Sequence, residues 1–416
     1  MQNRPLSIVI GGRDLNPSGI VGVPILGFEN GKPELSHIEL RNCLMSHQYF
    51  RNYGIFTKLE LAVLRDLGYP IDLENFWGYS IYDDSGTYTL SGSDSFCARV
   101  PVADQPGIYE YEIETPNPTP LTIGLHIYGH NNTVRLVDGY SVLQSGNGSA
   151  GIRVDGWEKI VEIGNDSQIM SAGEDGIGMM VCYGKGHRIY QNAYADTMVV
   201  GTGSEIIGDI VSKWNPFKPF VQYDDRTRHT LHPKIYFGGR RDESTDSLVA
   251  DSSYNGTFIG NISAEFGALD VCLMGGTLNW GRRDDDSPQK MSALERFRMC
   301  RGTCLRLESD FVHIAAKELM FEPDTTIITP SRRNFRIHVE VPEDIVLDCD
   351  SFCRNVKFKD CDSGQQNSFD IDYLVEEPDD VIHPKSRIYK FFKPSLEDFF
   401  MDDSLDMNAS WDVDDF

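Results

Sequence analysis

The residues best suited to metal chemistry are ten histidines, and their spacing does not match a zinc peptidase. A peptidase of the zincin type needs two histidines one helical turn apart, with a glutamate beside the first that activates the metal-bound water. His126 and His130 have this spacing, but Ile127 replaces the glutamate, and Gly129 indicates a strand and turn. No His-Glu-x-x-His sequence occurs anywhere in the chain. We therefore predict no catalytic residue and no metal-binding residue of this kind.

Nine cysteines offer thiol chemistry in a looser arrangement. Two groups have three or seven residues between neighbours: Cys300 and Cys304, and then Cys349, Cys353 and Cys361. Compact structural zinc sites more often have two residues between ligands, so free thiols are favoured over disulfides and over zinc. An odd number also leaves at least one cysteine unpaired within the chain. We expect no cofactor. His229 and His232, three residues apart among polar residues, are expected in a solvated loop.

Paired carboxylates would indicate a carbohydrate-cleaving enzyme, because glycoside hydrolysis uses two carboxyl groups about 5–9.5 Å apart. The candidates are Asp138, Asp155, Asp166, Glu174 and Asp175. Most of them stand beside Gly or Asn, where turns use Asp to bind the backbone. We predict that these acids are turn residues.

The elements that would position these side chains are mainly short β-strands. The chain has 38 glycines, and short apolar runs recur between Gly, Asn and Asp, which is typical of an all-β protein. One segment instead predicts a helix over residues 57–67, with Thr57 and Glu60 as a capping box and Gly68 after its end. A second helix is predicted near Pro288 to Arg298.

An internal repeat gives the strongest indication of the fold. Runs starting at Gly124, Gly151 and Gly178 follow one another at a constant interval. Further strands are predicted at matching offsets: Thr133–Leu136, Ile160–Ile163 and Arg188–Tyr190, followed by Ser141–Leu143, Gln168–Met170 and Met198–Val200. Each unit is too small to bury an apolar face alone, but stacked units can do so. The repeat predicts a right-handed parallel β-helix with coils of about 27 residues, and a β-sandwich is the alternative.

In that β-helix, Leu125, Ile152 and Met179 should occupy equivalent inward positions, and so should the residues two places later. Beyond Val200 the period blurs, and from Gly281 onward it is lost. The last residues, 395–416, contain eight acids and no Lys or Arg, which predicts an acidic disordered tail.

Charge and hydropathy argue against nucleic acid binding and membrane association. The net charge of −25 disfavours nucleic acid and anionic membrane surfaces. The longest apolar stretch is about half of the ~20 residues that a membrane helix needs. No signal peptide is visible in this chain, and we expect no membrane insertion by it.

Residues 35–49 and 56–69 resemble a junction in large autotransporter proteins of Gram-negative bacteria, where a metallopeptidase-like module leads into a β-helical passenger domain. Within that resemblance, which covers about residues 5–280, Leu44-Met45-Ser46 is similar to the Met-turn of a metzincin, and 57–69 is similar to the helix that follows it. The catalytic helix of the family is missing upstream, so His37 is at best a remnant of a third ligand, and His37 and His47 together supply at most a weak surface pair.

The resemblance implies a peptidase-like remnant and cap in residues 1–80, in which Met45, Leu61, Leu64 and Leu67 pack on the end of the solenoid. It further implies a passenger-like β-helix in 81–280, before an irregular β-rich region in 281–394 and the tail in 395–416. The expected function is that of a non-catalytic, adhesin-like protein, secreted or on the cell surface, which binds a host, biofilm or glycan surface. A zinc metallopeptidase relict or a carbohydrate-active β-helix enzyme is the alternative.

Overall fold

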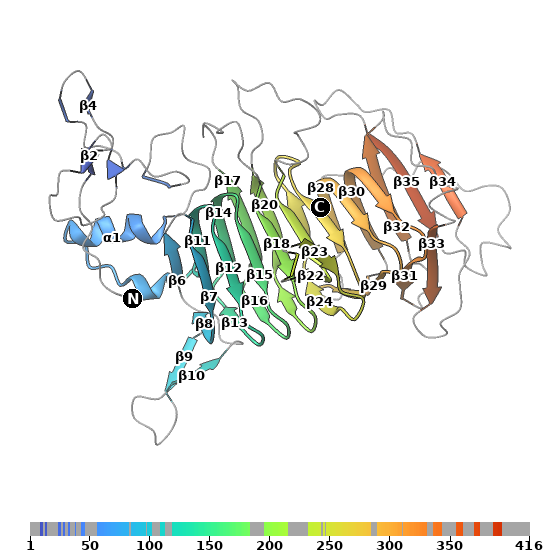
Figure 1. The fold of residues 1–416 in the computed structure, drawn as a ribbon, viewed down its shortest axis with the longest axis horizontal. Helices are drawn as coiled ribbons and strands as arrows, with labels where there is room; N and C mark the ends of the chain where they lie inside the picture. Colours follow the sequence, from blue (N-terminus) through green and yellow to red (C-terminus); the bar gives the residue numbers. More distant parts are fainter. Residues whose placement is uncertain are drawn as a thin grey trace.

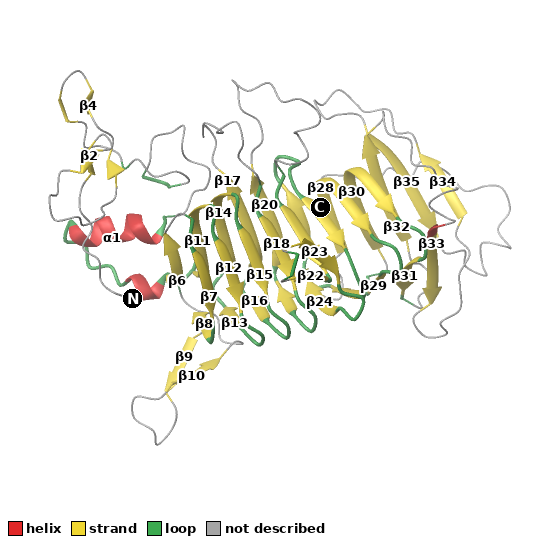
Figure 2. Cartoon of the chain, in the orientation of Figure 1, coloured by secondary structure: helices red, strands yellow, loops and turns green. Residues whose placement is uncertain are grey.

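A computed structural model describes the chain in segments. The main ones are residues 56–82, 85–96, 98–101, 109–112, 119–183, 195–214, 232–242, 244–245, 247–283, 289–309, 311–330, 336–342, 355–360, 370–374 and 386–392. Short pieces are described at 9–10, 13–14, 24–25, 28–29, 32–33, 38 and 43–45. Within these residues the protein is mainly β, with long stacks of parallel strands (Figures 1 and 2).

Three ladders of parallel strands run along the molecule, and successive strands of the chain pass from one ladder to the next. The first ladder contains β6 (Trp77–Tyr82), β11 (Ile123–His130), β14 (Ala150–Trp157), β17 (Ile177–Tyr183), β20 (Asp209–Trp214), β25 (Ile262–Ala264), β28 (Gln289–Met299), β30 (Phe311–Phe321) and β32 (Arg336–Pro342). The second contains β7 (Thr87–Leu90), β12 (Thr133–Leu136), β15 (Ile160–Ile163), β18 (Thr197–Val200), β21 (Lys234–Phe237) and β26 (Asp270–Leu273), and then the later parts of β28 and β30. The third contains β8 (Ser93–Phe96), β13 (Ser141–Gln144), β16 (Gln168–Ser171), β19 (Glu205–Ile207), β24 (Asn255–Ile259), β27 (Thr277–Gly281), β29 (Cys304–Leu307), β31 (Thr325–Thr329) and β33 (Val356–Asp360).

From β11 to β17 the register of the first ladder is the one that the repeat predicts. Leu125 pairs with Ile152, which pairs with Met179, so the pairing follows the interval of the repeat in both steps. All three side chains are fully buried. The residues two places later, Ile127, Val154 and Val181, align in the same way and are also fully buried. The predicted stacking of equivalent inward positions is therefore confirmed.

The ladder of one predicted strand and the type of one predicted element are wrong. Met198–Val200 belongs to the second ladder and pairs with β15, because a longer segment precedes it; the third-ladder strand of this coil is β19. The predicted strand at Arg188–Tyr190 lies outside the described residues. The predicted helix at 288–298 is the strand β28, in which burial largely alternates. The prediction relied on Pro288 as a first helical residue, and a strand follows it instead, with a bulge at Ala293, φ +55°, that interrupts the pairing with β30.

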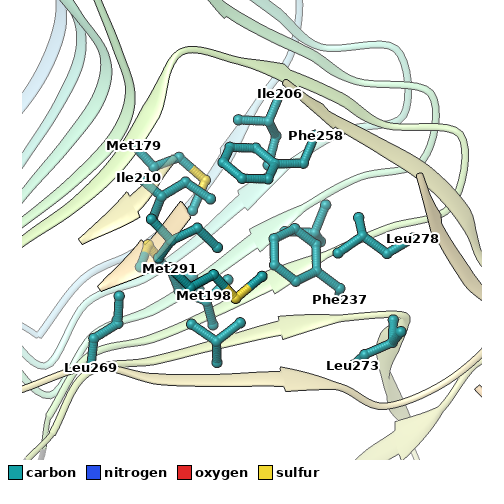
Figure 3. Close-up of a cluster of buried hydrophobic side chains, with 14 of the residues drawn as sticks. Met179, Met198, Ile206, Ile210, Phe237, Phe258, Leu269, Leu273, Leu278 and Met291 are labelled. Carbon is teal, nitrogen blue, oxygen red and sulfur yellow. The ribbon is translucent and has the colours of Figure 1, made fainter. Parts of the chain in front are cut away.

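Inward side chains of the three ladders form one continuous core. Figure 3 shows a part of it, where Met179, Met198, Ile206 and Phe258 meet from several coils. Trp280 is also fully buried, and its indole N–H donates to the Gly260 carbonyl at 2.8 Å. Parallel stacking continues past residue 281 through β33, so these later strands extend the same core.

Antiparallel strands close the far end, where β35 (Ser386–Phe392) pairs with β32 and with β34 (Asp370–Leu374). Smaller antiparallel pairs are β9 (Ala98–Pro101) with β10 (Tyr109–Glu112), β22 (Gly239–Asp242) with β23 (Ser247–Ala250), and β4 (Phe28–Glu29) with β5 (Lys32–Pro33). β1 (Val9–Ile10) lies between β2 (Arg13–Asp14) and β3 (Pro24–Ile25). Residues 344–347 and 395–416 lie outside the described part.

Candidate functional site

The helix α1 (Lys58–Asp66) contacts the candidate site through its first residue, and it begins where the sequence predicts. The Thr57 hydroxyl accepts from the Glu60 amide, and the Glu60 carboxylate accepts from the Thr57 amide, which completes a capping box. The other Glu60 oxygen accepts from the Met45 amide. Gly68 follows the helix with φ of +96°, a conformation that favours glycine. A single carboxylate thus joins the helix start to residue 45.

The helix α1 belongs to a buried apolar cluster that continues through the strand starts of the first coils. Leu61 and Ala62 share this cluster with Trp77, Ile123 and Ala150, and Leu64 and Ile177 are partly buried against it. Met45 contacts another side of the helix, in a small cluster with Ile38 and Cys43. The 3-10 turn η1 (Leu73–Asn75) leads from the helix into β6. The predicted packing of Leu67 is wrong, because 69% of this residue is exposed one position after the last helical turn.

Beneath this helix, outward-facing side chains of the first ladder form a buried hydrogen-bond chain, here called the clamp: Tyr82, His126, Arg153 and Asp155. His126 Nε2 lies 2.6 Å from an Asp155 carboxylate oxygen, and its Nδ1 lies 2.9 Å from the Tyr82 hydroxyl. The Arg153 Nε lies 2.7 Å from the same Asp155 oxygen. The Tyr82 hydroxyl also accepts from the amide of Lys58 at 3.0 Å, the first residue of α1.

A neutral His126 satisfies both of its bonds. An ionised Asp155 can only accept, so Nε2 carries a proton and donates to it, and in the neutral imidazole Nδ1 accepts from the Tyr82 hydroxyl. Burial lowers the pKa of His126 to about 4, although Asp155 acts in the opposite direction. Burial also acts to raise the pKa of Asp155, but the Arg153 guanidinium and the His126 bond hold it below the ordinary value. One Asp155–Arg153 ion pair therefore lies beside a neutral imidazole.

A hydroxyl, an imidazole and a carboxylate in this order resemble the nucleophile, base and orienting group of covalent catalysis. Here, however, His126, Arg153 and Asp155 are all fully buried. Burial, as the main cause, also holds the pKa of the Tyr82 hydroxyl well above its usual range. The thiols that adjoin the clamp, Cys43 and Cys182, are buried too, and burial raises the pKa of both. The arrangement suits a structural tie between α1 and the first coils.

The other candidate residues are dispersed. His130 is not brought to His126 as a ligand pair; its ring stacks on Trp157 with centroids 4.9 Å apart. His232 is buried, 4.0 Å from Glu295, so the prediction of a solvated loop is wrong for it. Cys300 follows β28, whereas Cys304 lies on the third ladder. His37, His47, His229, Cys349, Cys353 and Cys361 lie outside the described residues.

Four of the five candidate acids are turn residues, as predicted. Asp138, Asp166, Glu174 and Asp175 occupy turns, and the Asp138 carboxylate accepts from the Asn165 amide at 2.8 Å. Asp155 is the exception, because it lies inside β14 and is fully buried. The constant interval of the repeat contained the signal for the clamp, since it places His126 beside Arg153 and Tyr128 beside Asp155.

Outside the clamp, the third ladder presents two straight rows of outward side chains. A polar row follows the register Ser141, Gln168, Glu205, Thr257, Asn279 and Arg306. An apolar row beside it follows the register Leu143, Met170, Ile207 and Ile259. Members of both rows are partly or fully exposed. Because adjacent strands lie about 4.8 Å apart, each row repeats its contacts at that interval.

Comparison with known proteins identifies no relative: no family model, curated protein or solved structure matches the chain. Among the described helices, none has the length and apolar character needed to cross a membrane.

Proposed function

We propose that this chain is a non-catalytic, adhesin-like β-solenoid that binds a neutral linear glycan along the outer face of its third ladder. In this proposal it is a right-handed parallel β-helix whose coils from β11 to β17 have the length of the sequence repeat. It is a fragment of an autotransporter passenger, secreted or at the surface of a bacterial cell. The glycan would belong to a host or biofilm surface. The observation that carries the proposal is the pair of straight outward rows, in register from coil to coil.

The chemistry of the two rows favours this partner. Hydroxyl, amide and carboxylate groups can bind sugar hydroxyls, and the apolar row can cover the less polar faces of the sugar rings. A linear polymer offers such groups repeatedly along its length, as the rows do. The net charge of −25 disfavours polyanionic polymers, which leaves neutral glycans as the better match.

The test is binding of the purified chain to immobilised neutral polysaccharides such as dextran, mannan and cellulose. We expect the double variant Gln168→Ala/Thr257→Ala to bind about thirtyfold more weakly, because each of the two lost hydrogen bonds costs about 1 kcal/mol. The matched control is Thr87→Ala/Thr89→Ala, which removes two exposed side chains from the second ladder and should bind normally. Equal binding by both double variants, or no binding to any of these polymers, would contradict the proposal.

A carbohydrate-active enzyme is the second candidate, because Asp270 has the pKa of a potential general acid. Burial raises its pKa to about 7, although Arg296 lowers it. It ranks second because Asp270 is only 6% exposed, and the next acid along this row, Glu318, is paired with Arg296 at 2.7 Å. Release of reducing ends from the same polysaccharides, abolished in Asp270→Asn, would replace the binding proposal with this one.

A further inference from the structure

Two cysteines meet on the outer side of the second ladder, away from the clamp. Cys272 lies in β26, and Cys300 directly follows β28, the strand that stacks on β26. Their sulfur atoms are 3.8 Å apart. The Cys300 amide donates to the Leu273 carbonyl at 2.9 Å, which holds the two backbones together at this point.

We propose that Cys272 and Cys300 form a reversible redox pair, which closes to a disulfide between adjacent coils when the chain meets a small-molecule disulfide such as oxidised glutathione. A disulfide needs its sulfur atoms about 2.05 Å apart, so a closure of less than about 2 Å between two side chains on neighbouring strands is required. This pairing differs from the sequence-based grouping of Cys300 with Cys304, which lies on another ladder.

The two thiols have different environments, and these determine which one attacks glutathione and which one then closes the disulfide. Cys300 is partly exposed, whereas only 8% of Cys272 is exposed. The hydrogen bond from Cys272 and the neighbouring Arg298 guanidinium lower the pKa of Cys300 to about 7. The same hydrogen bond and burial raise the pKa of Cys272. Cys300 is therefore the attacking thiolate, and Cys272 is the resolving thiol.

The reaction takes two exchange steps. The Cys300 thiolate attacks one sulfur of oxidised glutathione, which forms a mixed disulfide and releases one glutathione thiolate. Once Cys300 carries glutathione, its negative charge no longer opposes ionisation of Cys272. The Cys272 thiolate then attacks the Cys300 sulfur, forms the disulfide and releases the second glutathione. Two protein thiols are oxidised, one glutathione disulfide is reduced, and the two thiol protons leave with the two glutathione molecules or the buffer.

The test exposes the folded, fully reduced chain to oxidised glutathione and maps its cysteines by peptide mass spectrometry after rapid alkylation. We expect a Cys272–Cys300 crosslinked peptide that is lighter by two hydrogens and is lost on treatment with dithiothreitol. The crosslink should also raise the midpoint of thermal unfolding, because it closes a 28-residue separation in the unfolded chain.

Three variants make the assignment falsifiable. Cys272→Ser should accumulate glutathione on Cys300, since the resolving thiol is gone. Cys300→Ser should leave Cys272 unmodified, and Cys304→Ser, the matched control, should crosslink as the unaltered chain does. The proposal is overturned if glutathione remains on Cys300 in the unaltered chain, if Cys300 crosslinks to another cysteine, or if both thiols stay fully alkylatable.

Discussion

Replacing Asp155 with alanine is expected to lower the free energy of unfolding by about 3–5 kcal/mol. The variant leaves the Arg153 guanidinium fully buried without the carboxylate that it pairs with, and it removes the acceptor of the His126 Nε2 proton. Removing one partner of a buried ion pair is among the most destabilising changes that a single substitution can make. Urea unfolding of the two proteins, followed by circular dichroism, measures the difference.

The matched control is Glu174→Ala, which also removes one carboxylate from the same group of coils. Glu174 lies in an exposed turn, so its loss should change the free energy of unfolding by less than about 0.5 kcal/mol. Asp155→Asn keeps the shape of the side chain but not its charge. Its loss in the free energy of unfolding should lie between the losses of Asp155→Ala and Glu174→Ala. A change for Asp155→Ala as small as that for Glu174→Ala would show that the clamp does not stabilise the fold.

Replacing His126 with glutamine is expected to remove about 2 kcal/mol of pH dependence between about pH 7.5 and about pH 5.0. Folding lowers the pKa of His126 from 6.5 to about 4. In this window the unfolded chain therefore binds more protons at this position than the folded chain does. The stabilising contribution is fully present above pH 6.5 and is lost as the pH falls toward 4.

The wild-type pH profile alone does not isolate this effect. Burial raises the pKa of Asp196 to about 6 and that of Asp270 to about 7, so these acids change stability in the opposite direction over the same window. Both acids remain in His126→Gln, so subtracting its profile from that of the wild type isolates His126. Parallel profiles for the two proteins would mean that folding leaves the pKa of His126 unchanged, which would contradict the neutral imidazole in the clamp.

The sequence predicted the part of the fold that depends on local periodicity. The constant interval of the repeat placed Leu125, Ile152 and Met179 in one inward row, and the capping box placed the start of α1 correctly. Both signals come from residues that are close in sequence or repeat at a fixed interval. They fail where the interval lengthens, because Met179 pairs with Ile210, and Ile210 pairs with the still more distant Ile262.

The clamp shows why the candidate site was harder to predict. Asp155 stands beside Gly156, a sequence context that it shares with the turn residue Asp138, but it lies inside β14 and is fully buried. That burial, together with its bonds to His126 and Arg153 from neighbouring positions of the first ladder, is tertiary structure that the local sequence around Asp155 does not encode. The strand β28 illustrates the same limit, since the Ser287-Pro288 sequence is typical of a helix start and a strand follows it.

The central claim is that the clamp holds α1 on the solenoid. Native-state hydrogen exchange of the intact chain tests it most directly. We predict that amides inside α1 open with free energies close to those of β14, and that Asp155→Ala lowers the α1 values far more than those of β29 and β31. Rapid exchange of α1 in the unaltered chain, or α1 values that are the same in both proteins, would contradict the claim.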